Sequence, residues 1–266
     1  MTISGFGPSL SPKNVLDFLN KDGNILLALS GQSGTPSAIN SLLIELDLHL
    51  PTDRSSVVVD HFNHDTLSAA DDHDVLLLQQ PAPLRADTKS FFNGQGVLAF
   101  PRATPQSLGA DNPLIAPIVR APATAYSHNP KEDAPAAEDI TATGSQLAIV
   151  SAMQSRNSAR FTVLGSVESL EDKWFSATVK GPNDGKKAET ANRDFAKQLT
   201  SWAFKETGVL KVGKIEHHLA EDGEIASEKL NPTIYRIKNG TVRACTKEGD
   251  QADNTGVPHR GFRVQS

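Results

Sequence analysis

The chain has 266 residues, 38% of them hydrophobic, so it is long enough to bury a sizeable core. It carries 26 Lys and Arg against 31 Asp and Glu, a net charge of −5, and its lack of a long basic block argues against nucleic acid as a partner. The single cysteine, Cys245, excludes an internal disulfide, and no apolar run approaches the ~20 residues that a membrane-spanning helix needs.

The first 60 residues predict helices that alternate with short buried strands. Ser11 followed by Pro12 is a typical helix start, and Gly23 is placed to end that helix. The next expected elements are a buried strand at 25–29, a helix from 35 onward and a buried strand at 57–59. This alternation predicts an α/β fold: a mostly parallel sheet with helices on both faces, layered as in flavodoxin or in class I glutamine amidotransferases.

Beyond residue 60 the pattern is interrupted by prolines and then becomes regular again. Strands are expected at 75–78, 97–100, 147–151 and 161–164, an exposed loop at 127–143, a helix around 167–175 and a strand at 209–212. An amphipathic helix places Phe195, Leu199 and Trp202 on one face and is expected to stop at Gly208. From 216 onward the chain is polar, and residues 235–238 read as the first strand of a new domain.

The turn at residues 30–35 follows a strand and opens a helix, which is a suitable place for backbone N–H groups to hold an anion. Gly31 and Ser33 are therefore candidate ligand-contact residues. The turn lacks the Gly-Lys-Ser/Thr ending of a P-loop and the glycine spacing of a dinucleotide site. It also holds no cysteine at the elbow where class I glutamine amidotransferases carry one. A plain tight turn is the simpler interpretation.

A polar cluster, Asp-His-Phe-Asn-His-Asp, comes directly after the strand at 57–59. Asp60, His61 and Asn63 are candidate contact residues for a ligand or partner, because ligands bind at strand ends in open α/β sheets. Together with His64 and His73, this stretch has the residue types of a metal site. Nothing marks the stretch as helical, however, so an ordinary polar loop is the simpler interpretation.

Three other features carry little signal. Cys245 lies outside a strand-turn-helix elbow and has no histidine near it in sequence, which argues against a nucleophile. His217 and His218 are adjacent, so on a strand they would face opposite ways. The Asn239-Gly-Thr triplet fits a glycosylation acceptor but arises often by chance. We therefore expect no catalytic residue, no metal and no cofactor.

Five stretches together carry a longer pattern: residues 6–27, 57–65, 111–127, 154–175 and 202–218. The most specific are 154–166, Gln-Ser-Arg-Asn-Ser-Ala-Arg-Phe-Thr-Val-Leu-Gly-Ser, and 202–213, Trp-Ala-Phe-Lys-Glu-Thr-Gly-Val-Leu-Lys-Val-Gly. In this order they resemble the dolichyl-diphosphooligosaccharide–protein glycosyltransferase 48 kDa subunit family, in its fungal form, over residues 5–238.

The resemblance implies a non-catalytic subunit of the oligosaccharyltransferase complex, which transfers a lipid-linked oligosaccharide to Asn of nascent proteins. It implies a place on the luminal side of the endoplasmic reticulum membrane. The implied partners are the other subunits, including the multi-spanning catalytic subunit and the ribophorin-type subunits. The implied domains are a luminal α/β domain at 1–215, without its opening strands, and a linker with the truncated start of a β-rich domain at 216–266. The family's signal peptide and transmembrane helix are not recognised in these residues.

Two other functions remain open from the residues alone. A glycan- or peptide-binding module would use the loops at 31–35 and 60–65, although the scarcity of aromatic residues argues against sugar stacking. A metallohydrolase would use Asp60, His61, His64 and His73.

Overall fold

The computed structural model describes residues 11–79, 96–129, 132, 142–183, 186–209, 215–217, 234–238, 241–245 and 261–265, the last four ranges without their side chains. The chain divides into two compact units, residues 1–207 and residues 208–266. Within the described residues, no helix has both the length and the apolar character needed to cross a membrane.

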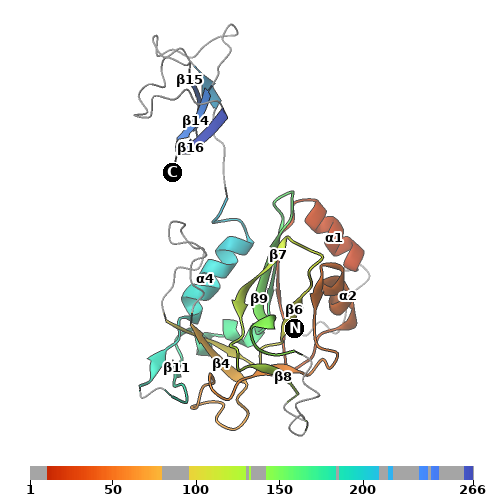
Figure 1. Ribbon diagram of the computed structural model, residues 1–266, viewed down its shortest axis with the longest axis vertical. Helices are drawn as coiled ribbons and strands as arrows, with labels where there is room; N and C mark the ends of the chain where they lie inside the picture. The colour runs from red at the N-terminus through yellow and green to blue at the C-terminus, as the bar shows by residue number, and fades with distance from the viewer. Residues whose placement is uncertain are drawn as a thin grey trace. The chain divides into compact units, whose positions relative to one another are not determined.

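The first unit is built on a six-stranded sheet (Figure 1). Its strands lie in the order β1 (Ile25–Ala28), β10 (Arg160–Leu164), β9 (Leu147–Gln154), β6 (Gln106–Leu108) and β2 (Leu48–His49), and β7 (Ile115–Arg120) also pairs with β9. Only β1 and β10 run parallel, and every other pairing in this sheet is antiparallel. The class is therefore α/β as predicted, but the mostly parallel sheet with flavodoxin-like layering is wrong.

The predicted parallel sheet does not form because three buried strands do not join the main sheet. β3 (Val57–Val59) pairs antiparallel with β8 (Tyr126–His128), and β4 (Val75–Gln79) pairs antiparallel with β5 (Val97–Pro101). All three side chains of β3 are buried, which is the pattern that a central parallel strand would give. Here the burial comes from packing of small antiparallel ladders onto the rest of the unit, so a continuous apolar run does not reveal its pairing partner.

Helices cover both faces of the main sheet (Figure 1). α1 (Pro12–Asn20) and α2 (Ser37–Glu45) share one apolar cluster with Phe161 and Val163 of β10. α4 (Asn192–Ala203) contributes Phe195 and Leu199 to a second cluster, which contains Leu164. Successive residues of β10 therefore face two different cores, as the alternation of side chains along a strand requires.

Local sequence patterns predict where the helices α1 and α4 lie. The Ser11 side chain accepts a hydrogen bond from the N–H of Asn14 at 3.3 Å, as a helix N-cap should. The predicted face of α4 is buried, although the helix ends at Ala203 and Gly208, with φ +65°, comes after a further turn. The expected helix at 167–175 is a 3₁₀ turn (η2, Val167–Leu170) followed by the short α3 (Asp172–Phe175).

The remaining elements are short. The first unit also contains η1 (Gly144–Gln146) and the ladder of β11 (Thr178–Val179) with β12 (Ala188–Glu189). The second unit is a four-stranded sheet in the order β13 (Ile215–His217), β15 (Thr241–Cys245), β14 (Ile234–Lys238) and β16 (Gly261–Gln265). The loop expected at 127–143 begins with two residues that belong to β8. The strand expected at 209–212 lies outside the described residues except for Val209, which is in no strand.

Candidate functional site

The loop after β3 is organised around the carboxylate of Asp60, which is fully buried. Its Oδ1 accepts hydrogen bonds from the backbone N–H groups of Phe62 (2.8 Å) and Asn63 (3.2 Å). Its Oδ2 accepts from Asn63 Nδ2 (3.0 Å) and from the hydroxyl of Thr124 (2.7 Å). Four donors thus occupy the two oxygens, and Asp60 acts as the structural centre of a turn.

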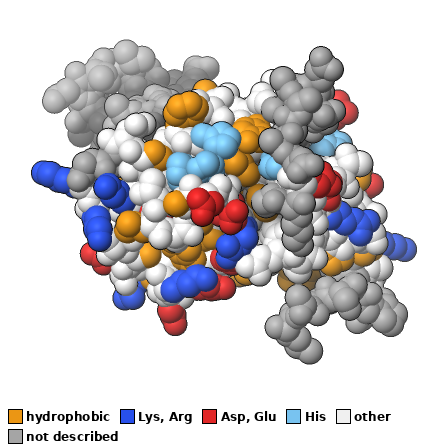
Figure 2. All heavy atoms as spheres, turned by 90° about the horizontal axis from the view of Figure 1, so that it is seen from below, with side chains coloured by type: hydrophobic (Ala, Val, Ile, Leu, Met, Phe, Trp, Pro, Cys, Tyr) orange, Lys and Arg blue, Asp and Glu red, His pale blue; other side chains and the backbone are white. Residues whose placement is uncertain are grey.

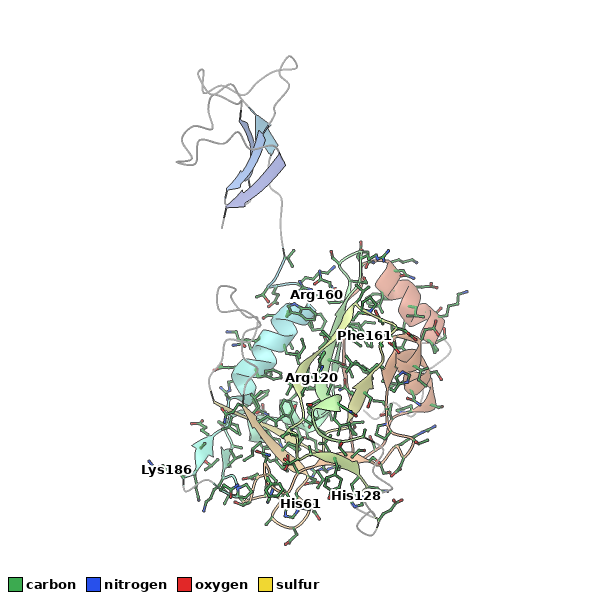
Figure 3. The ribbon with its side chains drawn as sticks, in the orientation of Figure 1. His61, Arg120, His128, Arg160, Phe161 and Lys186 are labelled. Carbon is green, nitrogen blue, oxygen red and sulfur yellow. The ribbon has the colours of Figure 1, made fainter. Side chains whose placement is uncertain are left out.

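Three histidines and a tyrosine lie against this turn, at the end of the unit where Figure 3 labels His61. His61 Nδ1 is 2.7 Å from Nδ1 of His73, and His61 Nε2 is 2.9 Å from the hydroxyl of Tyr126. His64 Nδ1 donates to the backbone carbonyl of Asp60 at 3.1 Å, and the His64 and His73 rings lie 4.2 Å apart. Figure 2 shows histidine side chains gathered on this face, next to acidic side chains. Burial raises the pKa of the Tyr126 phenol, so this group is neutral at physiological pH.

Two of the stretches that carried the family resemblance meet in this network. Residues 57–65 supply β3, Asp60 and His61, while residues 124–127 supply Thr124 and Tyr126. The pairing of β3 with β8 sets Val59 opposite Tyr126. Sequence reasoning named Asp60, His61 and Asn63 but not these partners, because the two stretches lie about sixty residues apart and no local pattern links them.

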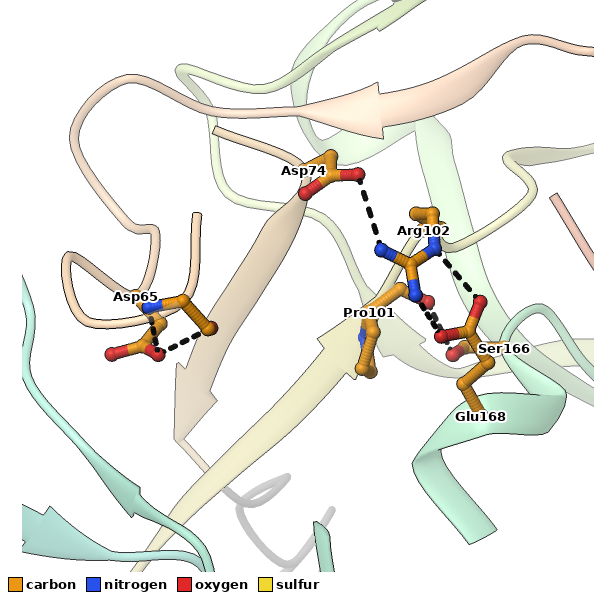
Figure 4. Close-up of polar contacts among 7 residues, drawn as sticks. Asp65, Asp74, Pro101, Arg102, Ser166 and Glu168 are labelled. Atoms are coloured by element: carbon orange, nitrogen blue, oxygen red, sulfur yellow. Dashed lines mark hydrogen bonds and ion pairs between the residues drawn. The ribbon is translucent and has the colours of Figure 1, made fainter. Parts of the chain in front are cut away.

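Asp65 ends the same loop in a similar way. Its side chain is buried and accepts from the N–H and the hydroxyl of Ser68, the latter at 2.5 Å (dashed lines at Asp65 in Figure 4). It also accepts from the N–H of Leu67 and, at 2.8 Å, from the N–H of Lys180. The carboxylates on either side of this loop therefore fix its shape, and neither has an oxygen free of hydrogen bonds.

An ion-paired group lies nearby, where β5 ends (Figure 4). Arg102 donates from Nε to Glu168 at 2.9 Å and makes a second contact from Nη2, while its Nη1 is 3.8 Å from Asp74. The hydrogen bond to Glu168 raises the pKa of Arg102. Burial raises the pKa of Asp74, against the attraction of Arg102. Each charge has a partner, which is typical of a structural ion-pair group.

The turn at Gly31 and Ser33 is not joined to the Asp60 loop by any hydrogen bond between described residues. Gly31 is buried, and a Cβ atom built on it would lie 2.4 Å from the carbonyl oxygen of Arg102 and 2.5 Å from Val57 Cγ1. Ser33 is exposed. The glycine is therefore required by close packing, which agrees with a plain tight turn, and no contact between described residues tests whether Gly31 and Ser33 bind a ligand.

No group of three or more His, Cys, Asp or Glu side chains is arranged to hold a metal ion in the part of the chain that the structure describes. The geometry explains this at the histidines. Both nitrogens of His61 contact other side chains, and His64 uses Nδ1 to bind a carbonyl. His217 and Cys245 lie in β13 and β15, and their side chains are outside the described residues.

A separate cleft of about 180 Å³ lies between the ends of β2, β6, β8 and β9. Its lining includes His49, Pro51, Pro105, Ser107, Ser127 and Leu147. None of the candidate residues named from the sequence lines it.

The geometry of the described residues does not identify a function, but comparison with known proteins identifies a family. Residues 1–206 match the family model described as "OST48, N-terminal domain". The chain is similar to the dolichyl-diphosphooligosaccharide–protein glycosyltransferase 48 kDa subunit of Danio rerio, with 30% identity over 245 residues, covering 89% of this chain and 51% of that protein. It is also similar to subunit wbp1 of this enzyme in Schizosaccharomyces pombe, with 32% identity over 246 residues, covering 89% of this chain and 50% of that protein.

The 48 kDa subunit of Caenorhabditis elegans is 33% identical over 223 residues, which is 80% of this chain and 47% of that protein. The chain thus spans about half the length of the curated relatives it matches. Among solved structures, the mmIFT52 N-terminal domain superposes with a TM-score of 0.46 at 14% identity, covering 76% of this chain and 72% of that one.

Proposed function

The chain belongs to the OST48 family, the 48 kDa subunits of dolichyl-diphosphooligosaccharide–protein glycosyltransferase, and we propose that it serves this enzyme as a non-catalytic subunit in protein N-glycosylation. The family match over residues 1–206 is the observation that carries the proposal. The chain spans about half of the length of these relatives, so the proposal concerns the role of this half within the complex.

The polar loop at 60–65 supports a structural role for these residues. Glycosyl transfer needs a general base or a metal ion close to the acceptor. Asp60 and Asp65 are buried, and they accept hydrogen bonds from the loop and from Thr124 and Lys180, so neither carboxylate presents an oxygen to a substrate. This arrangement supports a role in assembly or stability of the complex and gives no support to a metallohydrolase.

We further propose that the partners are other subunits of the same enzyme, including its multi-spanning catalytic subunit and the ribophorin-type subunits. The proposed location is the luminal side of the endoplasmic reticulum membrane. Both proposals rest on family membership. The loops at 31–35 and 60–65 are the first surfaces to test for such contacts, because they lie at strand ends and carry the exposed side chains of Ser33, His61 and Phe62.

The experiment is affinity purification of the tagged full-length protein from detergent-solubilised microsomes. We expect the catalytic subunit to co-purify in stoichiometric amounts, and a luminal protein with the same tag serves as the control. Depleting the protein should lower glycosylation of secreted proteins. The purified protein alone should transfer no oligosaccharide to an acceptor peptide, with or without a divalent cation. Turnover by the protein alone, or normal glycosylation after depletion, would contradict the proposal.

A further inference from the structure

Two buried polar atoms without a hydrogen-bond partner belong to residues that line the same small cavity of the first unit. They are Oδ1 of Asn40, in α2, and Oγ1 of Thr104, in the connection between β5 and β6, and neither has a partner among the described residues. The cavity has a volume of about 10 Å³. Burying a polar atom without a partner is unfavourable, and folded proteins leave few such atoms. Two of them at one cavity point to a small molecule that binds both.

The cavity lies where three segments of the first unit meet. Besides Asn40 and Thr104, its lining consists of Thr35, Leu50, Pro51, Asp53 and Arg54. Thr104 is 3% exposed and Thr35 is 5% exposed, so their part of the wall is buried, whereas Asp53 and Arg54 are exposed and mark the solvent side. A molecule in the cavity therefore contacts α2 and the connections after β1, β2 and β5 together.

The size of the cavity and the chemistry of its lining favour water. A volume of roughly 10–15 Å³ measured in this way holds one water molecule. Water can donate a hydrogen bond to Oδ1 of Asn40 and accept one from the hydroxyl of Thr104. An anion would be repelled by Oδ1 of Asn40. A cation would lack a free carboxylate, because Asp53 accepts hydrogen bonds from the N–H of Ser55 at 3.0 Å and from the hydroxyl of Ser56 at 3.3 Å.

We propose that this cavity is the binding site of one tightly held water molecule, which bridges Asn40 and Thr104 and so joins α2 to the connection between β5 and β6. The turn at 31–35 already packs on the same connection, because Gly31 lies against the carbonyl oxygen of Arg102. α2 begins without a side-chain cap, so the bridge gives this end of the helix a polar attachment. The water is thus part of the structure that holds the turn in place.

Crystal structures of the 266-residue protein and of two variants test the site directly. We expect an ordered water at hydrogen-bonding distance, about 2.7–3.2 Å, from both Asn40 Oδ1 and Thr104 Oγ1 in the native protein. Thr104→Ser keeps the hydroxyl and should keep the water. Thr104→Val replaces the hydroxyl with a methyl group of similar size and should lose it. Native density without a water at this position would overturn the proposal.

A double-mutant cycle in urea denaturation provides a second readout, which needs no crystals. Asn40→Leu and Thr104→Val each remove one end of the bridge and leave the other atom buried without a partner, so each should lower the midpoint. The double variant removes both atoms. Its midpoint should therefore fall by no more than the larger of the two single shifts. Additive shifts would show that no water links the two residues.

Thr162→Val is the matched control for Thr104→Val. Oγ1 of Thr162 is also buried without a partner in the described part of the chain, but Thr162 lines neither this cavity nor the cleft of about 180 Å³. Its hydroxyl has no bridge to lose, so Thr162→Val should leave the midpoint unchanged or raise it. The same result for Thr104→Val would contradict the proposal, because it would show that the Thr104 hydroxyl holds no water either.

Discussion

The guanidinium of Arg160 lies over the indole ring of Trp202, 4.6 Å from its centroid (Figure 3 labels Arg160). From this position its Nη1 donates to the backbone carbonyls of Trp202 at 2.5 Å and of Thr207 at 2.8 Å. The last carbonyls of a helix lack partners within the helix, and a cation at this end is favoured by the helix dipole. Arg160, which is 2% exposed, thus joins β10 to the end of α4 and to the last residue of the first unit.

Replacing Arg160 with Met keeps most of the length of the side chain but leaves both carbonyls without this donor. We expect the variant to lower the free energy of unfolding by roughly 1.5–3 kcal/mol, the range for hydrogen bonds to a charged group. Urea denaturation followed by tryptophan fluorescence measures this. Arg193→Met, which removes an exposed arginine 5.9 Å from the Phe175 ring, should change stability by less than about 0.5 kcal/mol. Equal effects of the two variants would contradict the capping role.

Trp202, in the last turn of α4, packs against Arg160 of β10 and is 8% exposed. Trp202→Ala should open a cavity and cost roughly 3–5 kcal/mol, a large part of the stability of a domain. Phe204→Ala, two residues along the chain and 51% exposed, is the matched control and should cost well under ~1 kcal/mol. Thermal melting of both variants distinguishes them, and an unchanged midpoint for Trp202→Ala would show that the helix does not pack through this ring.

Asp60 is predicted to hold the turn after β3 by its charge and its acceptor oxygens together. Asp60→Asn replaces one acceptor with an N–H donor, which then faces donors that are already there. The expected loss is about 1–3 kcal/mol of unfolding free energy. Asp71→Asn, at an exposed aspartate in the same segment, should be close to neutral. Denaturation curves at pH 7 provide the measurement, and a stable Asp60→Asn variant would leave the carboxylate available for another role.

How well the sequence predicts each feature of the structure depends on how far apart in the chain the interacting residues lie. The start of α1 at Ser11, the burial of β3 and the apolar face of α4 follow from local pattern and were predicted. The pairing of Ile25 with Phe161 joins strands that 131 residues separate between Ala28 and Arg160, and nothing in either strand encodes the partner. The site behaves in the same way: Asp60 stood out in the sequence, whereas its bond to Thr124 depends on the fold.

The buried carboxyl group of Asp74 should make the protein less stable as the pH rises. Burial raises its pKa above the ordinary value of 3.8, so the folded state holds this proton more tightly than the unfolded state. Its contribution to stability is complete below pH ~3.8 and is lost as the pH rises through the folded pKa. Asp74→Asn should therefore remove this part of the pH dependence and be at least as stable as the native protein at pH 7. Urea unfolding at pH 4 and pH 7 tests this. A clear destabilisation at pH 7 would mean that the attraction of Arg102 outweighs burial.

Alanine substitutions at Gly31 and Gly23 test whether Gly31 is required for packing. At either position a Cβ atom would lie closer than 3.0 Å to a neighbour. At Gly31 the neighbours are the carbonyl oxygen of Arg102 and a Val57 methyl group within a buried strand, which cannot move without disturbing the core. At Gly23 the neighbour is the ring of Phe18, which is 52% exposed and free to turn toward solvent.

Gly31→Ala should therefore destabilise the protein by about 1–3 kcal/mol, as overpacking of a filled site does, while Gly23→Ala should cost much less. Chemical denaturation of the two variants gives the comparison. If the turn at Gly31 and Ser33 also held an anion, phosphate would raise the melting temperature of the native protein, and Ser33→Ala, at an exposed position, would reduce that shift without affecting stability in its absence. We expect no phosphate-dependent shift, because packing alone accounts for the glycine. A shift that Ser33→Ala removes would show that this strand end binds a ligand.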